Sequence, residues 1–149
     1  MDHSRTEIVR STAPSLLVLV AEGSRTDQMV LAKMLEQLGH QAQLVSNAEA
    51  TLDALERCQF DLVLIDVDTY GIDGINTVKL YRFASLGQSH VPVVAVTANA
   101  TPNVWARCQE AAMDGCLQKP IQPKQLSTTI DRLLGNHDSR KSSIGDRNR

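Results

Sequence analysis

Short runs of aliphatic residues alternate along the chain with longer segments of helical period, and this alternation restricts the fold more than any other feature. The first run, Leu16–Val20, is uninterrupted, as expected for a strand buried on both faces. Four further strands are predicted, over Gln41–Val45, Leu62–Ile65, Val91–Val96 and Cys116–Gln118. Five strands alternating with five helices favour right-handed crossovers and a parallel sheet with helices on both faces. The sequence therefore predicts one α/β domain over residues 15–134.

Capping residues indicate where the helices begin. Ser24 is the predicted N-cap of the first helix, with Asp27 three positions on in the pattern of a capping box. Asn47 is suited to cap the second helix, and Thr101 followed by proline is a typical start for the fourth. Gly39 stands where a C-terminal glycine is expected to end the first helix.

Apolar positions in the helices predict which faces pack on the sheet. The first helix has an apolar stripe of Val30, Leu31, Met34, Leu35 and Leu38. The third carries Val78, Leu80 and Phe83, and the last has Leu126, Ile130, Leu133 and Leu134 on one face. The fourth helix is expected to end near Asp114–Gly115.

The flanking segments and the composition predict a soluble cytoplasmic domain. Residues 1–14 are expected to be flexible, and residues 135–149, rich in Gly, Ser, Asn and charge, to form a disordered tail. The net charge of −2 gives no electrostatic reason for nucleic-acid or membrane-surface binding. No apolar run approaches the roughly 20 residues of a membrane span. Cys58, Cys108 and Cys116 lack metal-ligand spacing, which fits a reducing compartment.

Polar residues at the ends of four predicted strands point to one site. Glu22, Asp66, Thr97 and Lys119 each lie at or just past a strand's carboxyl end, where open parallel sheets bind ligands. Taken singly, an Asp after a strand is usually a turn former, and a Lys or Thr there is usually structural. Together they suit a hard divalent cation and a phosphoryl group, with an ionised aspartate as the nucleophile. Lys119 and the hydroxyl would then bind phosphoryl oxygens.

The segments LVLVAEGS, DLVLIDVDTYGIDG, PVVAVTANAT and CLQKPI, in this order, resemble the receiver domains of two-component signalling, the response regulator family. The resemblance covers about residues 15–134. It implies a flavodoxin-like (βα)5 fold, a doubly wound parallel five-stranded sheet, that takes phosphate from a phosphohistidine onto an aspartate with Mg²⁺. The segments LYRFASLGQ and VTANATP resemble most the receivers of hybrid sensor histidine kinases. The resemblance thus points to a hybrid histidine kinase as the parent protein. In a membrane-anchored kinase of this kind, the receiver belongs to the cytoplasmic part.

The resemblance assigns roles to individual residues. Asp66 matches the phosphoacceptor, Thr97 the switch hydroxyl and Lys119 the lysine that pairs with the phosphate. For the metal, Glu22 matches the first of two acids after the first strand, and Asp68 matches the residue whose backbone carbonyl binds the ion beside Asp66. The implied partners are a histidine kinase or a histidine phosphotransfer domain. Other protein domains are expected on the face formed by the fourth helix, fifth strand and fifth helix.

Three positions depart from the family pattern. Gly23 replaces the second acid, so Mg²⁺ binding is expected to be weak, and the sequence leaves open whether the Asp68 side chain compensates. Thr69-Tyr70 replaces a Met-Pro pair, and Cys116 fills the position of an aromatic switch residue. The departures therefore affect the metal and the output switch.

Two other functions fit parts of the pattern. A degenerate receiver would bind a partner without phosphorylation. Gly23, Tyr70 and Cys116 favour this alternative, whereas intact Asp66, Thr97 and Lys119 oppose it. A haloacid-dehalogenase-type phosphatase would use an Asp-x-Asp motif such as Asp66-Val67-Asp68. That motif opens its fold near the first strand, whereas Asp66 ends the third predicted strand.

Overall fold

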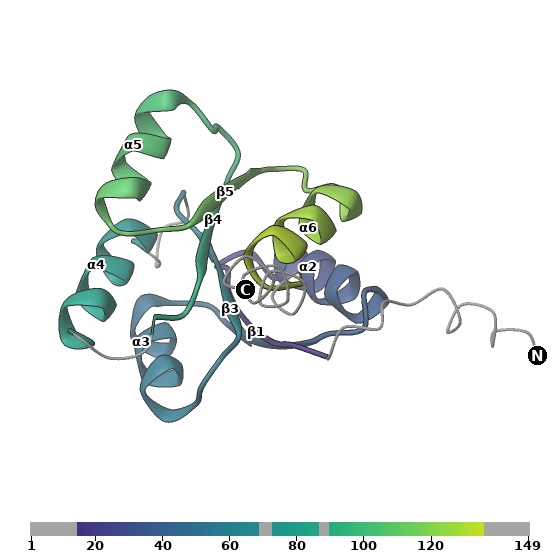
Figure 1. Ribbon diagram of the computed structural model, residues 1–149, viewed down its shortest axis with the longest axis horizontal. Coiled ribbons are helices and arrows are strands. Elements are labelled where there is room, and N and C mark those ends of the chain that lie inside the picture. The colour runs from purple at the N-terminus through teal and green to yellow at the C-terminus, as the bar shows by residue number, and fades with distance from the viewer. Residues whose placement is uncertain (1–14, 69–72, 87–89, 136–149) are drawn as a thin grey trace, which may run out of the picture.

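The computed structural model describes residues 15–68, 73–86 and 90–135. Within these ranges, parallel strands form one five-stranded sheet in the order β2-β1-β3-β4-β5 (Figure 1). The strands are β1 (Leu17–Ala21), β2 (Gln41–Val45), β3 (Leu62–Asp66), β4 (Val93–Thr97) and β5 (Gly115–Gln118). This is the strand order of flavodoxin-like folds, so the predicted fold class is confirmed.

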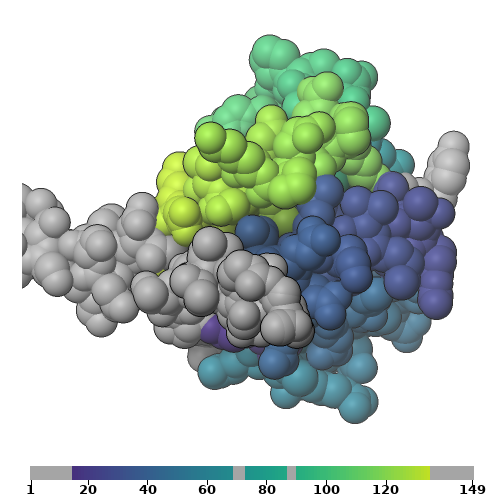
Figure 2. Space-filling model, turned by 90° about the vertical axis from the view of Figure 1, so that its right-hand side faces the viewer, coloured from purple at the N-terminus to yellow at the C-terminus, as the bar shows by residue number. Residues whose placement is uncertain are grey.

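Helices cover both faces of the sheet. The α-helices of the described ranges are α2 (Arg25–Gln37), α3 (Ala48–Arg57), α4 (Gly74–Ala84), α5 (Pro102–Glu110) and α6 (Pro123–Ile130). A π-helix, η1 (Asp131–Gly135), continues directly from α6. Helices α3, α4 and α5 lie on one face, and α2 and α6 lie on the other (Figure 1). Figure 2 shows the second face, with α2 in blue-violet and α6 in yellow-green.

Strands β1, β3 and β4 are buried on both sides because their residues are aliphatic up to the Asp or Thr that ends β3 and β4. Strand β2 at the edge of the sheet has Gln41 and Gln43 exposed instead. Alternate side chains point to opposite faces of a strand. One set packs under α3, α4 and α5, and the intervening set packs under α2 and α6. The buried residues of β1, β3 and β4 in these two sets are at most 1% exposed: Leu19, Ala21, Val63, Ile65, Val93 and Ala95 in the first, and Val18, Val20, Leu62, Leu64, Val94 and Val96 in the second.

The predicted N-caps are confirmed, with one correction. The side chains of Ser24, Asn47 and Thr101 each accept a hydrogen bond from the backbone N–H three residues on. The predicted capping box at the first helix is only half formed. Asp27 does not complete it, because the Ser24 N–H donates to Glu22 and the Asp27 carboxylate binds Lys119 instead.

Gly39 closes the end of α2 as predicted, two residues after Gln37, but α5 ends earlier than predicted. Gly39 has φ 92°, and the bonds from Gly39 and the residue after it close a Schellman motif. Helix α5 stops at Glu110 rather than near Asp114, because Ala112 takes φ 64° and the same motif forms there. The turn lets Met113 bury its side chain, which is 5% exposed. No glycine marks this end in the sequence.

Three apolar residues that the sequence analysis placed on the buried faces of helices lie outside the core. Val30 is 45% exposed although the sequence placed it in the buried stripe of α2. Gln28 is buried instead, because its carboxamide donates to the backbone carbonyls of Glu22 and Val45. Leu80 and Phe83 on α4 are also exposed. The residues of α4 that face the sheet are Gly74, Ile75, Thr77 and Val78.

No helix within the described ranges is both long and apolar enough to cross a membrane. The expected flexible segment 1–14 and the tail from residue 136 lie outside the described residues, as do Thr69 and Tyr70. The proposed domain boundaries therefore stay predictions. All three cysteines are free thiols, and burial raises the pKa of Cys108 and of Cys116.

Candidate functional site

The predicted site residues gather at the carboxyl edge of the sheet. Strands β1 and β3 are neighbours there, while the chain continues outward from them in opposite directions, to β2 and to β4. This is the topological switch point, where α/β sheets of this kind bind ligands. Glu22 directly follows β1, Asp66 ends β3, Thr97 ends β4 and Lys119 directly follows β5.

Lys119 lies at the centre of a carboxylate cluster. Its Nζ atom is 2.9 Å from Oδ2 of Asp66, 2.9 Å from Oδ2 of Asp27 and 3.1 Å from Oε2 of Glu22. The side chains of Glu22 and Asp66 are fully buried, whereas that of Asp27 is 39% exposed. Burial alone lowers the pKa of Lys119, but its hydrogen bonds to Asp27, Asp66 and Glu22 raise the pKa well above its ordinary value. The lysine is therefore a fixed positive charge at physiological pH.

Glu22 is the member of the cluster whose ionised form is least favoured. Burial raises the pKa of its carboxyl to about 7, and the hydrogen bond and negative charge of Asp66 act in the same direction. The Ser24 N–H, which donates to Oε1 at 3.1 Å, and Lys119 lower the pKa only in part. Two buried carboxyls next to each other disfavour double ionisation. An additional cation at this place would relieve that repulsion.

Asp68 and Thr97 form a second group beside the first. The Asp68 N–H donates to Oδ1 of Asp66 at 2.6 Å, so the backbone of Asp68 faces the proposed phosphoacceptor. Its carboxylate points the other way and accepts the Thr97 hydroxyl, at 2.9 Å to Oδ1 and 3.0 Å to Oδ2, and the Ala98 N–H at 2.6 Å. In this conformation the Asp68 side chain does not take the place of the acid missing at Gly23.

Asp27 is a member of the cluster that the sequence analysis missed as a site residue. The sequence pattern predicts it only as part of a capping box. It lies in the first turn of α2, directly after the loop that leaves β1, and therefore at the same edge of the sheet as Glu22. The signal for it was available: an acid in the first turn of a helix that follows a strand end faces the ligand-binding edge.

The donors present fit Mg²⁺ in kind. Carboxylate and backbone carbonyl oxygens are the ligands this ion prefers, and it commonly keeps several waters. Three carboxylates already surround one ammonium group, so the edge is arranged to stabilise positive charge. Among the described residues, no group of three or more His, Cys, Asp or Glu side chains has by itself the arrangement of a metal site. A bound ion would depend on a carbonyl and on water as well.

The loop after β3 approaches the next helix very closely. A Cβ atom added to Gly74, the first residue of α4, would lie 2.7 Å from the backbone oxygen of Asp66 and 3.0 Å from Cγ1 of Val67. Such distances to a backbone atom are shorter than real side chains tolerate. A glycine at this position therefore lets α4 begin against the residue that carries the carboxylate.

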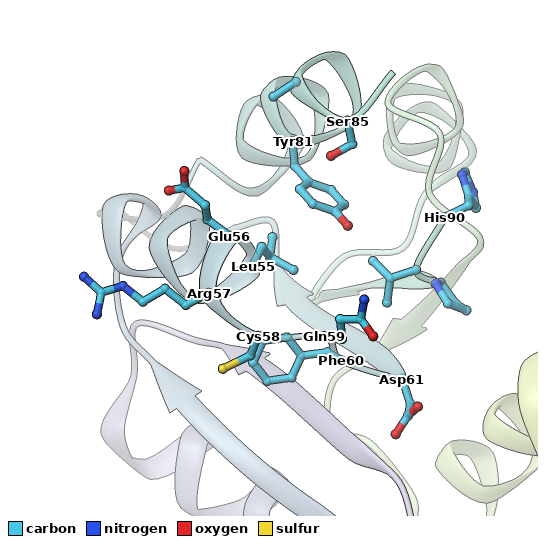
Figure 3. Close-up of a pocket in the computed structure, with 13 residues that line it drawn as sticks. Leu55, Glu56, Arg57, Cys58, Gln59, Phe60, Asp61, Tyr81, Ser85 and His90 are labelled. Carbon is cyan, nitrogen blue, oxygen red and sulfur yellow. The ribbon is translucent and has the colours of Figure 1, made fainter. Parts of the chain in front are cut away.

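A cavity of about 710 Å³ lies at the opposite edge of the sheet, among residues that precede β3 and β4 (Figure 3). Tyr81 of α4 points into it, and Leu55 and Phe60 line its wall. One of its acids is already engaged, because Oδ2 of Asp61 accepts the Leu17 N–H at 2.8 Å. None of the residues predicted to form the site lines this cavity. The carboxyl edge is the better candidate.

Comparison with known families and proteins agrees with this geometry. The family model described as the response regulator receiver domain matches residues 18–131. The sensory/regulatory protein RpfC of Xanthomonas campestris pv. campestris is 32% identical over 125 residues, covering 83% of this chain and 17% of RpfC. The chain thus spans about a sixth of the length of that relative.

Two solved structures share the fold. One is the receiver domain of the sensor histidine kinase PA1611 from Pseudomonas aeruginosa PAO1, with a magnesium ion coordinated in its active site cleft. It has a TM-score of 0.73 and 29% identity, over 82% of this chain and 99% of that chain. The other is a co-crystal of the Saccharomyces cerevisiae histidine phosphotransfer protein Ypd1 with the receiver domain of Ssk1. Its TM-score is 0.77 at 20% identity, over 85% of this chain and 94% of that chain, which shows the fold alone.

Proposed function

The chain belongs to the response regulator receiver family, and we propose that it accepts a phosphoryl group from a phosphohistidine on the carboxylate of Asp66. The placement of Asp66 supports this most directly. It ends β3 at the switch point of the sheet, 2.9 Å from the Lys119 ammonium. Thr97 at the end of the neighbouring strand would supply a hydroxyl donor once it leaves the Asp68 carboxylate. This arrangement fits phosphoryl transfer in a two-component phosphorelay.

The reaction exchanges one bond to phosphorus for another. A carboxylate oxygen of Asp66 attacks the phosphorus atom, the P–N bond of the phosphohistidine breaks, and its electron pair returns to the imidazole nitrogen. The product is an acyl phosphate on Asp66. The Lys119 ammonium would pair with the phosphoryl oxygens, whose charge the surrounding carboxylates would otherwise repel.

Access to Asp66 requires a local movement of Lys119. The Asp66 side chain is fully buried, and the lysine that contacts its Oδ2 is 23% exposed. The ammonium must therefore move from the carboxylate oxygen to the incoming phosphoryl group while keeping its other acidic partners. A long flexible side chain with three donors suits this role.

Mg²⁺ is the cofactor that we propose for this step. Asp66 and the backbone carbonyl of Asp68 would hold it directly, and Glu22 would bind it through water. When bound, the ion would neutralise charge on the transferring phosphoryl oxygens. With Gly23 in place of an acid, we expect the affinity to be low. The raised pKa of Glu22 supports the site, because a cation would relieve the crowding of its carboxyl against Asp66.

The proposed partner is a histidine kinase or a histidine phosphotransfer domain. We further infer that the domain works in the cytoplasm as part of a longer protein, such as a hybrid histidine kinase. Two similarities support this: RpfC is about six times longer than the matched segment, and the PA1611 domain belongs to a sensor histidine kinase. The face formed by α5, β5 and α6 is the proposed surface for other protein domains.

Labelling of the protein with a small phosphodonor tests the proposal. Incubation with radiolabelled acetyl phosphate and Mg²⁺ is expected to label wild type, and Asp66→Asn is expected to remove the label without unfolding the chain. Asp53→Asn, which changes an exposed acid on α3, is the control and is expected to keep the label. Label that persists in Asp66→Asn would identify another nucleophile. No label in folded wild type would favour a phosphorylation-independent binding module.

A further inference from the structure

The Thr97 hydroxyl is fully committed within the chain. A threonine hydroxyl has a single proton to donate. Thr97 is 0% exposed, its proton faces the Asp68 carboxylate at 2.9 and 3.0 Å, and its oxygen accepts the Asn99 N–H at 3.1 Å. The hydroxyl therefore cannot donate to a group on Asp66 unless it gives up Asp68.

We propose that Asp68 is a positioning residue that holds Thr97 away from Asp66 and so restrains the phosphorylated conformation. The proposal rests on the proposed function, because it requires that the Thr97 hydroxyl bind a phosphoryl group on Asp66. The Asp68 carboxylate is the acceptor that competes with this group for the hydroxyl. A hydrogen bond from a buried hydroxyl to a carboxylate is stronger than one between neutral groups. Phosphorylated Asp66 must compete with that acceptor. The relative strength of the two acceptors then sets how readily Thr97 leaves Asp68 and binds the phosphoryl group.

The backbone and the side chain of Asp68 act in different directions. The backbone N–H donates to Asp66, whereas the carboxylate reaches the end of β4, where it also accepts the Ala98 N–H. A side-chain substitution therefore leaves the backbone groups that face Asp66 in place. This separation allows the restraint to be removed without removing the backbone carbonyl proposed as a metal ligand.

Removing the Asp68 carboxylate would favour a phosphoryl group on Asp66 in two ways: it releases the Thr97 hydroxyl, and it removes a nearby negative charge. The test must separate these two effects. A phosphoryl group carries about two negative charges, so an acid nearby repels it. That repulsion does not depend on Thr97. The restraint, in contrast, exists only while the Thr97 hydroxyl is present. A double-mutant cycle between the two residues isolates the restraint.

Binding of beryllofluoride, a mimic of the phosphoryl group, measures the switch without a phosphodonor. Its affinity is followed by NMR titration of the Ala98 and Asn99 amides at saturating Mg²⁺, in wild type, Asp68→Ala, Thr97→Ala and the double variant. We expect Asp68→Ala to tighten binding about tenfold, which is about 1.4 kcal/mol. In the Thr97→Ala background, the same substitution is expected to change affinity less than about twofold, because no hydroxyl remains to be released and only the loss of charge acts.

Two further variants control for charge and folding. Asp53→Ala removes an equal charge from the exposed face of α3 and is expected to leave the affinity unchanged. Asp68→Asn keeps the size of the side chain with a weaker acceptor, and its affinity is expected to lie between those of wild type and Asp68→Ala. It serves as the test if Asp68→Ala does not fold.

The possible results separate the two proposals. Equal tightening with and without the Thr97 hydroxyl would mean that Asp68 acts only by charge and would overturn the restraint. Unchanged or weaker binding in Asp68→Ala and Asp68→Asn would overturn it as well, while binding by wild type would leave the proposed function intact. Wild type that neither binds beryllofluoride nor takes label from acetyl phosphate would overturn the proposed function and the restraint together.

Discussion

The carboxylate of Asp27 and the ammonium of Lys119, 92 positions apart in the sequence, are in contact at 2.9 Å. The pair joins the first turn of α2 to the residue that follows β5, and it shares the lysine with buried Asp66. Because the Asp27 side chain is 39% exposed, water screens its attraction to the lysine. The contact is therefore expected to matter more for the position of the ammonium than for the stability of the fold.

Asp27→Asn is predicted to lower the free energy of unfolding by about 0.5 kcal/mol, and to have no such effect in a Lys119→Met background. Urea denaturation of the four proteins measures this coupling. Glu36→Gln, which removes an exposed acid from the same helix, is the control. An equal loss in both backgrounds would mean that Asp27 acts through the start of α2 and not through the lysine.

Gly23→Asp is predicted to tighten Mg²⁺ binding about tenfold, which corresponds to about 1.4 kcal/mol. The substitution restores an acid directly after Glu22, where a carboxylate can add to the oxygen ligands at the edge of the sheet. Isothermal titration calorimetry with Mg²⁺, without a phosphodonor, measures the affinity of each protein for the ion. Asp68→Asn in the native background tests whether the Asp68 side chain leaves Thr97 to assist the ion. If the Mg²⁺ affinity of Gly23→Asp were unchanged or weaker, glycine would be needed at this position for the backbone conformation of the turn.

The sequence was sufficient for the fold because aliphatic runs and capping residues are local signals. Strand β2 has the predicted bounds, and Thr101 caps α5 as expected. The end of α5 could not be predicted, because Ala112 takes a positive φ that an alanine gives no reason to expect. The exposure of Leu80 and Phe83 was also hidden, because an apolar side chain on an outer helix face looks the same in sequence as one that packs.

For the site, the sequence supplied the residues but not their partners. Strand ends predict that Glu22, Asp66 and Lys119 meet at one edge, and the distances place them together. The direction of a side chain within a loop has no comparable signal. The sequence left open whether the Asp68 side chain assists the metal, and in the structure its carboxylate accepts the Thr97 hydroxyl. Asp27 was missed because its contact with Lys119 depends on how α2 is oriented relative to the end of β5.

Gly74→Ala is predicted to lower the free energy of unfolding by about 1–3 kcal/mol and to slow labelling of Asp66. The added methyl group would lie 2.7 Å from the Asp66 backbone oxygen, so either α4 or the loop must shift. Gly115→Ala is the matched control. There the nearest atom is the end of the flexible Arg132 side chain, at 3.2 Å, which can give way. Equal losses in the two variants would show that the close approach to Asp66 is not the cause.

His40 is a half-buried imidazole that holds the start of β1. Its Nδ1 atom accepts the Leu16 N–H at 3.1 Å, which requires that this nitrogen carry no proton. Burial lowers the pKa of His40 below its ordinary 6.5, although the charges of Asp131 and Asp61 act to raise it. The folded state therefore favours neutral imidazole. The stability that this provides is present above pH 6.5 and is lost as the pH falls through the lower pKa of the folded state.

His40→Asn is predicted to flatten the dependence of stability on pH below neutrality. Asparagine places an uncharged acceptor oxygen near the position of Nδ1, so the bond to Leu16 can remain while the titration is removed. Urea denaturation at about pH 7.5 and about pH 5 is expected to show a larger loss of free energy of unfolding on acidification in wild type than in the variant. His90→Asn, which changes an exposed histidine, is expected to keep the dependence of wild type. If wild type and His40→Asn lost equal stability between these two pH values, protonation of His40 could not be what weakens the fold in acid.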